Sequence, residues 1–154
     1  MENLPRGIRN NNPLNIRISL IAWIGKVKNN TDGAFEQFTS LEYGLRAAFI
    51  NIQTIVRRRS RCGEYTTLAQ LIHIWAPSSD GNNEIAYVAA VAKHSGIKSN
   101  DHIIIQNKTQ MCALVAAMCK VECGQEVSSL RIDSAYNLAF LRAGVRTLFD
   151  QPAD

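Results

Sequence analysis

The sequence predicts a mainly helical α+β domain that spans all 154 residues. From Thr39 onward, apolar residues recur with the spacing of amphipathic helices and follow helix-capping residues. The first forty residues instead contain short alternating runs set among Asn and Gly, a pattern typical of irregular strands. A chain of this length is sufficient for one compact domain, and no repeat or low-complexity linker divides it.

The composition is that of an ordinary globular protein with a mild positive charge. Hydrophobic residues make up 46% of the chain and charged residues 19%, with 17 Lys and Arg against 13 Asp and Glu. This excess of positive charge favours an anionic partner, such as nucleic acid, phospholipid or a cell wall that carries teichoic acid. No stretch approaches the roughly 18 consecutive apolar residues of a membrane span. The N-terminus lacks the apolar core of a signal peptide, so we expect synthesis in the cytoplasm, and a protein acting elsewhere would have to be carried or released by another route.

Three short runs near the N-terminus predict a small, irregular β region. Residues 14–17, 23–27 and 35–38 alternate between apolar and polar side chains, as half-buried strands do. Residues 29–33, with the sequence NNTDG, separate the last two runs and are typical of a hairpin turn.

About five helices are expected in the rest of the chain. Each predicted start has a capping residue, and several predicted ends have Gly or Pro. The expected helices are 39–59, with Thr39 and Glu42 as a capping box; 67–75, with Thr67 and Gln70 as a second box; 83–95, closed by Gly96; one from Asn107 or Thr109 to the residues before Gly124; and one from Asp133 or Ser134, with a break at Gly144 before 145–149.

The fourth of these helices contains the main catalytic candidate. At 100° per residue, Glu122 lies on the same face as Met111, Val115 and Met118, and the helix is apolar on nearly every side. Burial and the negative helix end should both raise the pKa of Glu122, as general-acid cleavage of a glycosidic bond requires. The alternative is that Glu122 points to solvent or pairs with an arginine.

Other clusters predict less chemistry. Cys112, Cys119 and Cys123 share a helix face, but their spacing is too wide for one zinc ion, so we expect neither a metal nor another cofactor. We interpret the four cysteines, Cys62 included, as reduced thiols. The basic run 57–61 has no interleaved aromatic residues, which favours a solvated helix end over nucleic-acid binding.

The N-terminal run RGIRNNNPLNIR, residues 6–17, resembles the opening of a phage- and prophage-borne family of lysozyme-like, lytic transglycosylase-like virion proteins. Further stretches follow in that family's order: WIG at 23–25 with FEQF at 35–38, YGLRAA at 43–48, and WAPS at 75–78 with Tyr87 downstream. The resemblance extends over about residues 6–126. The matching helix usually ends in a His-Glu-Asn-Gly-like sequence. Here it ends in VECG at 121–124, which keeps only the glutamate and the glycine.

The resemblance implies a single lysozyme-like domain that acts on peptidoglycan glycan strands. Glu122 is the catalytic candidate, and Glu36, which alternates outward in its run, is the second-rank one. Asparagine amides can hydrogen-bond sugar hydroxyl and acetamido groups, and tryptophan offers an apolar face to a sugar ring. The candidates for the sugar-binding cleft are Asn11, Asn12, Asn15, Trp23, Trp75 and Tyr87. For the asparagines the alternative is a role in turns, and for the tryptophans it is core packing.

The leading hypothesis is therefore a lytic transglycosylase or muramidase with one glutamate as general acid and base. The alternative is a non-catalytic virion structural or cell-wall-binding protein of the same fold, which would contact other virion proteins. A nucleic-acid-binding module built on residues 57–61 is the third hypothesis and the weakest.

Overall fold

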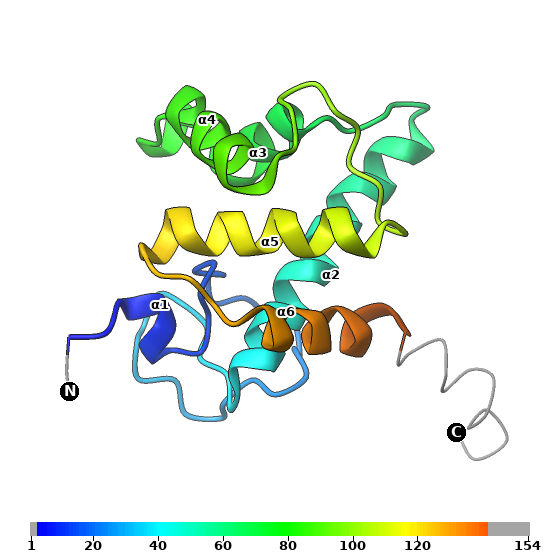
Figure 1. Cartoon of the computed structure of the whole chain (residues 1–154). Helices are drawn as coiled ribbons and strands as arrows, with labels where there is room; N and C mark the ends of the chain where they lie inside the picture. The colour runs from blue at the N-terminus through cyan, green and yellow to red at the C-terminus, as the bar shows by residue number, and fades with distance from the viewer. Residues whose placement is uncertain (1–2, 142–154) are drawn as a thin grey trace, which may run out of the picture.

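The computed structural model describes residues 3–141, and these residues form a mainly helical domain (Figure 1). Within this part of the chain the elements are α1 (Arg6–Arg9), α2 (Leu41–Arg61), α3 (Leu68–Trp75), the 3₁₀ turn η1 (Ser78–Asp80), α4 (Glu84–Ser95), α5 (Lys108–Cys123), α6 (Ser129–Tyr136) and the π-helical turn η2 (Asn137–Leu141).

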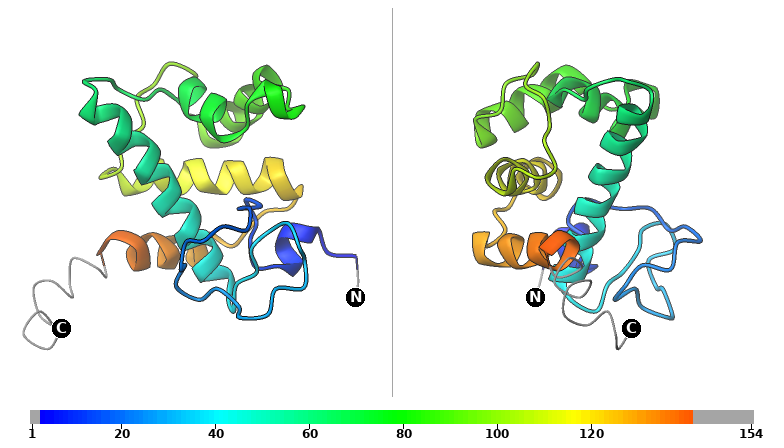
Figure 2. Two further views of the ribbon diagram at one scale, coloured as in Figure 1. Left: turned by 180° about the vertical axis from the view of Figure 1, so that it is seen from behind. Right: turned by 90° about the vertical axis from the view of Figure 1, so that its right-hand side faces the viewer.

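Helix α5 is the centre of the arrangement. It lies across the molecule with α3 and α4 on one side and α1 and α6 on the other, while α2 crosses it obliquely (Figures 1 and 2). Met111, Leu114, Val115 and Met118 on α5 are completely buried. The expectation that this helix runs through the core is confirmed, because α1, α2, α4 and α6 all pack against it.

A second part of the core joins α2 to the end of the described chain. The ring of Phe49 on α2 makes edge contacts with Tyr136 and Phe140, with ring centroids 5.5 and 6.0 Å apart. A bidentate ion pair between Arg131 on α6 and Glu42 on α2, at 2.7 and 2.8 Å, fixes the same two helices from outside. Glu42 therefore pairs with α6 and is not part of the capping box predicted with Thr39. The N-cap of α2 is Ser40.

Most helix ends follow the local signals. Thr67 and Gln70 form the predicted capping box of α3, and Asn107 caps α5. Gly96 and Gly124 end α4 and α5 in the left-handed conformation, as expected for residues without a Cβ.

Two helices differ from the sequence prediction. Helix α6 begins at Ser129, one turn before the predicted start at Asp133. Its N-cap, Ser128, makes no side-chain capping hydrogen bond, so the usual local signal of a helix start is missing here. The one-turn helix α1 lies inside the N-terminal motif and was not predicted. The predicted break at Gly144 and the segment 145–149 lie outside the described residues.

The predicted β region is wrong in its secondary structure. Residues 3–141 contain no regular strand. The N-terminal segment has only isolated antiparallel bridges, Arg17 with Phe35 and Lys26 with Phe38. Side chains take over the backbone hydrogen bonds that a ladder would make. Asn12 binds the carbonyls of Ile16 and Glu36 at 2.9 Å, and Asp32 accepts from the N–H groups of Ala34 and Phe35.

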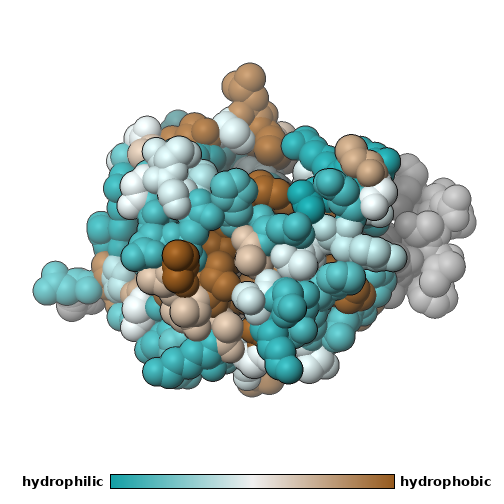
Figure 3. Space-filling view, turned by 90° about the horizontal axis from the view of Figure 1, so that it is seen from above, coloured by the Kyte–Doolittle hydropathy of each residue, from teal (hydrophilic) through white to brown (hydrophobic). Residues whose placement is uncertain are grey.

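Two surface properties complete the description. No helix within residues 3–141 combines the length and the apolarity needed to cross a membrane. Viewed from the side of α3 and α4, apolar surface is divided into separate areas among hydrophilic side chains, and one such area projects from the edge of the molecule (Figure 3).

Candidate active site

Glu122 lies in the last turn of α5 and is partly buried. Its Oε2 accepts a 2.8 Å hydrogen bond from the hydroxyl of Tyr87 on α4, and its Oε1 accepts a longer one, 3.4 Å, from Nδ2 of Asn15. The side chain of Trp75, at the end of α3, lies close enough to the carboxylate to lower its pKa. Glu122 thus does not project freely into solvent, and no arginine within residues 3–141 pairs with it.

The surroundings of Glu122 favour its protonated form. Burial is the largest influence and raises the pKa of the carboxyl group above its ordinary value, while Tyr87, Asn15 and Trp75 act in the opposite direction. Burial also raises the pKa of Tyr87, with the neighbouring charge of Glu122 adding to the effect. Tyr87 therefore stays a hydrogen-bond donor to Glu122. A carboxyl group with a raised pKa is better suited than an ordinary one to donate a proton as a general acid.

Close backbone contacts hold the N-terminal motif against the end of α5. The thiol of Cys123 donates a 3.1 Å hydrogen bond to the carbonyl of Pro13. Gly7 in α1 packs so closely that a Cβ would lie 3.0 Å from the sulfur of Cys123 and 2.9 Å from the carbonyl oxygen of Asn12. These contacts hold Asn15 next to Glu122. Asn15 itself has a left-handed φ of 53°.

A groove of about 770 Å³ begins beside this carboxylate. Asn15, which hydrogen-bonds to Glu122, and Trp75, which lowers the pKa of Glu122, both line the groove, whereas Glu122 itself is not part of the lining. The loop from Leu14 to Trp23 forms one wall. The polar or charged residues of the lining are Asn15, Arg17, Ser19, Asn51, Thr54, Arg58 and Asp80.

The tryptophan candidates both line the groove. Trp75 is partly exposed, while Trp23 is 9% exposed and combines core packing with a place in the groove wall. Within the described residues, Nε1 of Trp23 and Oδ1 of Asn15 are buried without a hydrogen-bond partner. Tyr87 is not in the lining, and its hydroxyl hydrogen-bonds to Glu122, so its binding to sugar stays a prediction.

Asn11 and Asn12 do not line the groove. Asn12 is fully buried, and its amide is occupied by Ile16 and Glu36 backbone groups. Asn11 donates to the carbonyl of Phe38 at 3.0 Å. Both asparagines therefore shape the N-terminal fold, which is the turn-forming alternative, and neither lies in the groove lining.

Glu36 is also internal. It is fully buried, pairs with Lys26 at 3.1 Å and accepts a hydrogen bond from the backbone N–H of Ser19 at 3.1 Å. Only Oε2 makes these contacts, and Oε1 has no partner within the described residues, but the full burial of the side chain contradicts the prediction that Glu36 faces a cleft. All four cysteines are free thiols, and within residues 3–141 no cluster of three or more His, Cys, Asp or Glu side chains could hold a metal ion.

Sequence reasoning missed the polar face of α2. Asn51, Thr54 and Arg58 lie three to four residues apart, so one side of the helix presents them to the groove. That spacing was readable in the sequence, but nothing local indicated that this face borders a groove. Arg58 was interpreted only as part of a solvated helix end.

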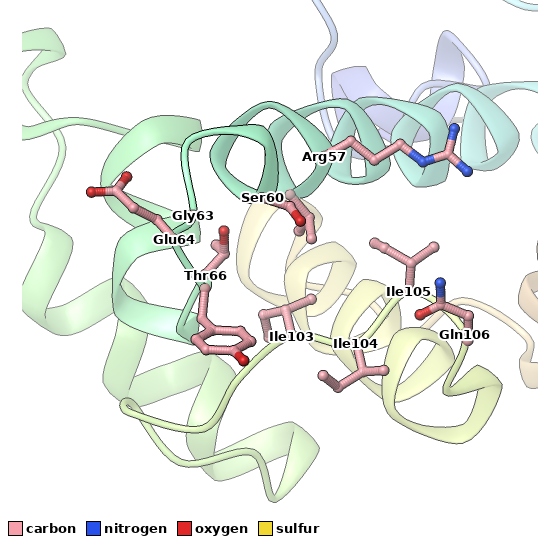
Figure 4. Close-up of a pocket in the computed structure, with 11 residues that line it drawn as sticks. Arg57, Ser60, Gly63, Glu64, Thr66, Ile103, Ile104, Ile105 and Gln106 are labelled. Carbon is pink, nitrogen blue, oxygen red and sulfur yellow. The ribbon is translucent and has the colours of Figure 1, made fainter.

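A second cavity, of about 430 Å³, shares no lining residue with the groove (Figure 4). Arg57 and Ser60 of α2 face it, opposite Ile103, Ile104 and Ile105. None of the residues predicted to bind or cleave substrate lines this cavity.

Comparison with known proteins places the chain among phage proteins. No family model matches it. Over 122 residues it is 30% identical to Protein P5 of Pseudoalteromonas phage PM2, in an alignment that covers 77% of this chain and 71% of that protein.

Proposed function

This chain belongs to the family of Protein P5 of Pseudoalteromonas phage PM2, and we propose that it is a lysozyme-like protein that cleaves the glycan strands of peptidoglycan. The lysozyme-like character of the helical fold and the peptidoglycan substrate are both parts of this proposal. They are supported by the resemblance of residues 6–126 and by the site around Glu122.

The observation that carries the proposal is the setting of Glu122. Its carboxyl group is partly buried, has a raised pKa and is held by Tyr87, while Asn15 and Trp75 connect it to the groove. Trp23 and Trp75 give the groove apolar faces, and Asn51 and Thr54 give it hydrogen-bonding groups. A mixed lining of this kind suits the faces and hydroxyl groups of sugar rings.

In the first step, protonated Glu122 donates its proton to the glycosidic oxygen. The bond from that oxygen to the anomeric carbon breaks, positive charge develops on the sugar ring, and Glu122 becomes a carboxylate. The hydrogen bond from Tyr87 stabilises this carboxylate as it forms.

In the second step, Glu122 acts as a base. It takes the proton of the C6 hydroxyl group of the same sugar, whose oxygen bonds to the anomeric carbon and closes an anhydro ring. The carboxyl group is then protonated again, as it was at the start. This route requires one carboxyl group, that of Glu122, and the acidic residue of the groove lining, Asp80, takes no part in it.

Purified peptidoglycan provides the test. The wild-type protein should release muropeptides with anhydro ends, detected by mass spectrometry, and Glu122→Gln should lower the rate about 10²- to 10⁴-fold, the usual contribution of a general acid. Glu126→Gln is the matched control because Glu126 is exposed just beyond the same helix. Its rate should equal that of the wild type.

The same experiment distinguishes the enzyme hypothesis from its alternative, a non-catalytic virion or cell-wall-binding protein. Two observations favour that alternative: a phage protein is the relative found, and Glu122 lies behind the groove lining. A wild-type protein that sediments with the wall and releases no fragment would support it and would refute the enzyme hypothesis. Incorporation into purified virions, followed by mass spectrometry, tests the proposed virion association independently.

A further inference from the structure

Two arginines stand in the groove that begins beside Glu122. Arg17 enters from the N-terminal loop, and Arg58 comes from the last turns of α2. Both residues are exposed. The guanidinium of Arg17 lies over the ring of Phe35, 5.4 Å from the ring centroid. This contact restricts the positions that the guanidinium group can occupy. The two cations reach one groove from separate parts of the chain.

Within the described residues 3–141, neither Arg17 nor Arg58 forms an ion pair with an acidic side chain. Among residues 3–141 the cations in ion pairs within 4 Å are Arg6, Lys26, Arg59, His73, Lys108 and Arg131. Asp80 also lines the groove, so its charged lining carries two positive charges and one negative charge. A neutral glycan such as chitin offers these guanidinium groups hydrogen-bond acceptors but no negative charge to pair with.

We infer that the groove is specific for a glycan that carries carboxylates, and that Arg17 and Arg58 hold those carboxylates. The inference rests on the proposed function and names the chemistry by which its substrate is recognised. In peptidoglycan the carboxylates belong to the stem peptides, which begin at the lactyl group of every muramic acid residue. An arginine fork binds a carboxylate through two parallel hydrogen bonds, which gives orientation as well as affinity.

Arg57 provides an internal control for this inference. It is adjacent to Arg58 and has the same charge, yet it lines the separate cavity shown in Figure 4. Consecutive residues on a helix point about 100° apart. Charge alone therefore predicts the same effect for Arg57→Gln and Arg58→Gln, whereas a carboxylate site in the groove predicts an effect for Arg58→Gln alone.

The experiment measures binding in a Glu122→Gln background, which prevents cleavage. The ligands are a purified peptidoglycan tetrasaccharide with its peptides and chitotetraose, which has the same number of rings and no carboxylate. An exposed ion pair of about 1 kcal/mol corresponds to roughly fivefold in affinity. Arg17→Gln and Arg58→Gln should each weaken binding of the peptidoglycan fragment by about that factor, and their combination by about 25-fold if the two sites are additive.

Binding of chitotetraose should change less than about twofold in all variants, and Arg57→Gln should leave both affinities unchanged. Arg58→Lys should recover part of the loss because it keeps the charge without the fork. Equal loss from Arg57→Gln, or equal affinity for the two ligands, would overturn the inference and leave the proposed function standing. Failure of the Glu122→Gln protein to bind either ligand would overturn both.

Discussion

The hydroxyl of Tyr87 donates a 2.8 Å hydrogen bond to Oε2 of Glu122 and thereby joins the first turn of α4 to the last turn of α5. Glu122 is thus held by a neighbour that has no charge of its own. Burial raises the pKa of Glu122, and Tyr87 opposes that effect. The balance between the two sets the pH at which the carboxyl group can donate a proton.

Replacing Tyr87 by Phe should move the alkaline limit of activity to higher pH. The hydrogen bond stabilises the carboxylate, so its removal raises the pKa of Glu122 further and keeps the acid protonated over a wider range. The maximal rate should fall about tenfold, because a hydrogen bond to a charged group contributes about 1.5 kcal/mol. Muropeptide release measured from pH 5 to 9 checks both effects.

Tyr65→Phe is the matched control because Tyr65 is exposed and lines the other cavity. It should show the wild-type pH profile. A Tyr87→Phe profile that moves to lower pH would contradict the assigned direction of the hydrogen bond.

Replacing Glu122 by Gln should stabilise the protein at neutral pH. A carboxyl group whose pKa is raised by folding contributes stability that is complete below its unfolded pKa of about 4.3 and is lost as the pH rises through the folded value. The amide of the glutamine variant does not ionise, so the variant loses no stability as the pH rises through this range. The melting temperature of the variant should therefore exceed that of the wild type at pH 8, and the difference should shrink towards pH 4.

Thermal unfolding followed by circular dichroism at the two pH values measures this difference. Glu126→Gln, at an exposed position, should show no comparable pH-dependent gain. An equal gain at pH 4 and pH 8 would mean that the substitution acts through packing and not through ionisation.

Replacing Asp80 by Asn separates the two possible reactions of the site. Asp80 is the acidic residue among the groove lining, on the 3₁₀ turn η1 after Trp75. If the C6 hydroxyl group attacks, as proposed, no second carboxylate takes part and the variant should keep its rate within about threefold, a change of about 0.6 kcal/mol in the barrier. A loss above 10²-fold, with products lacking anhydro ends, would indicate hydrolysis with two carboxyl groups.

Replacing Gly44 by Ala should destabilise the whole N-terminal region. A Cβ at this position would lie 1.8 Å from the carbonyl oxygen of Asn11, a backbone atom that cannot move independently. We expect a loss of roughly 3 kcal/mol, the upper part of the range for overpacked sites. Urea unfolding measures it.

Gly33→Ala is the control for Gly44→Ala. A Cβ at Gly33 meets no atom within 4 Å, so the expected cost is that of its left-handed φ of 87°, about 1 kcal/mol. Equal losses at the two glycines would show that the Asn11 contact is unimportant.

Helix signals were the most reliable part of the sequence prediction. Thr67 with Gln70, Asn107 and Gly124 all act where local rules place them, because capping involves residues only a few positions apart. The N-terminal strands were wrong for the opposite reason. Asn12 and Asp32 bind backbone groups that a ladder would have used, and no alternating pattern reveals such a replacement.

The sequence by itself determined that Glu122 would lie on an apolar face near the end of a core helix, since helical periodicity fixes which residues share a side. Only the tertiary structure decided that Tyr87, Asn15 and Trp75 surround it, that Asn12 and Glu36 are internal, and that Arg58 faces the groove while Arg57 faces another cavity. These relationships join segments up to 107 residues apart, as in the contact of Asn15 with Glu122. Packing between helices creates such contacts, and local sequence patterns do not encode them.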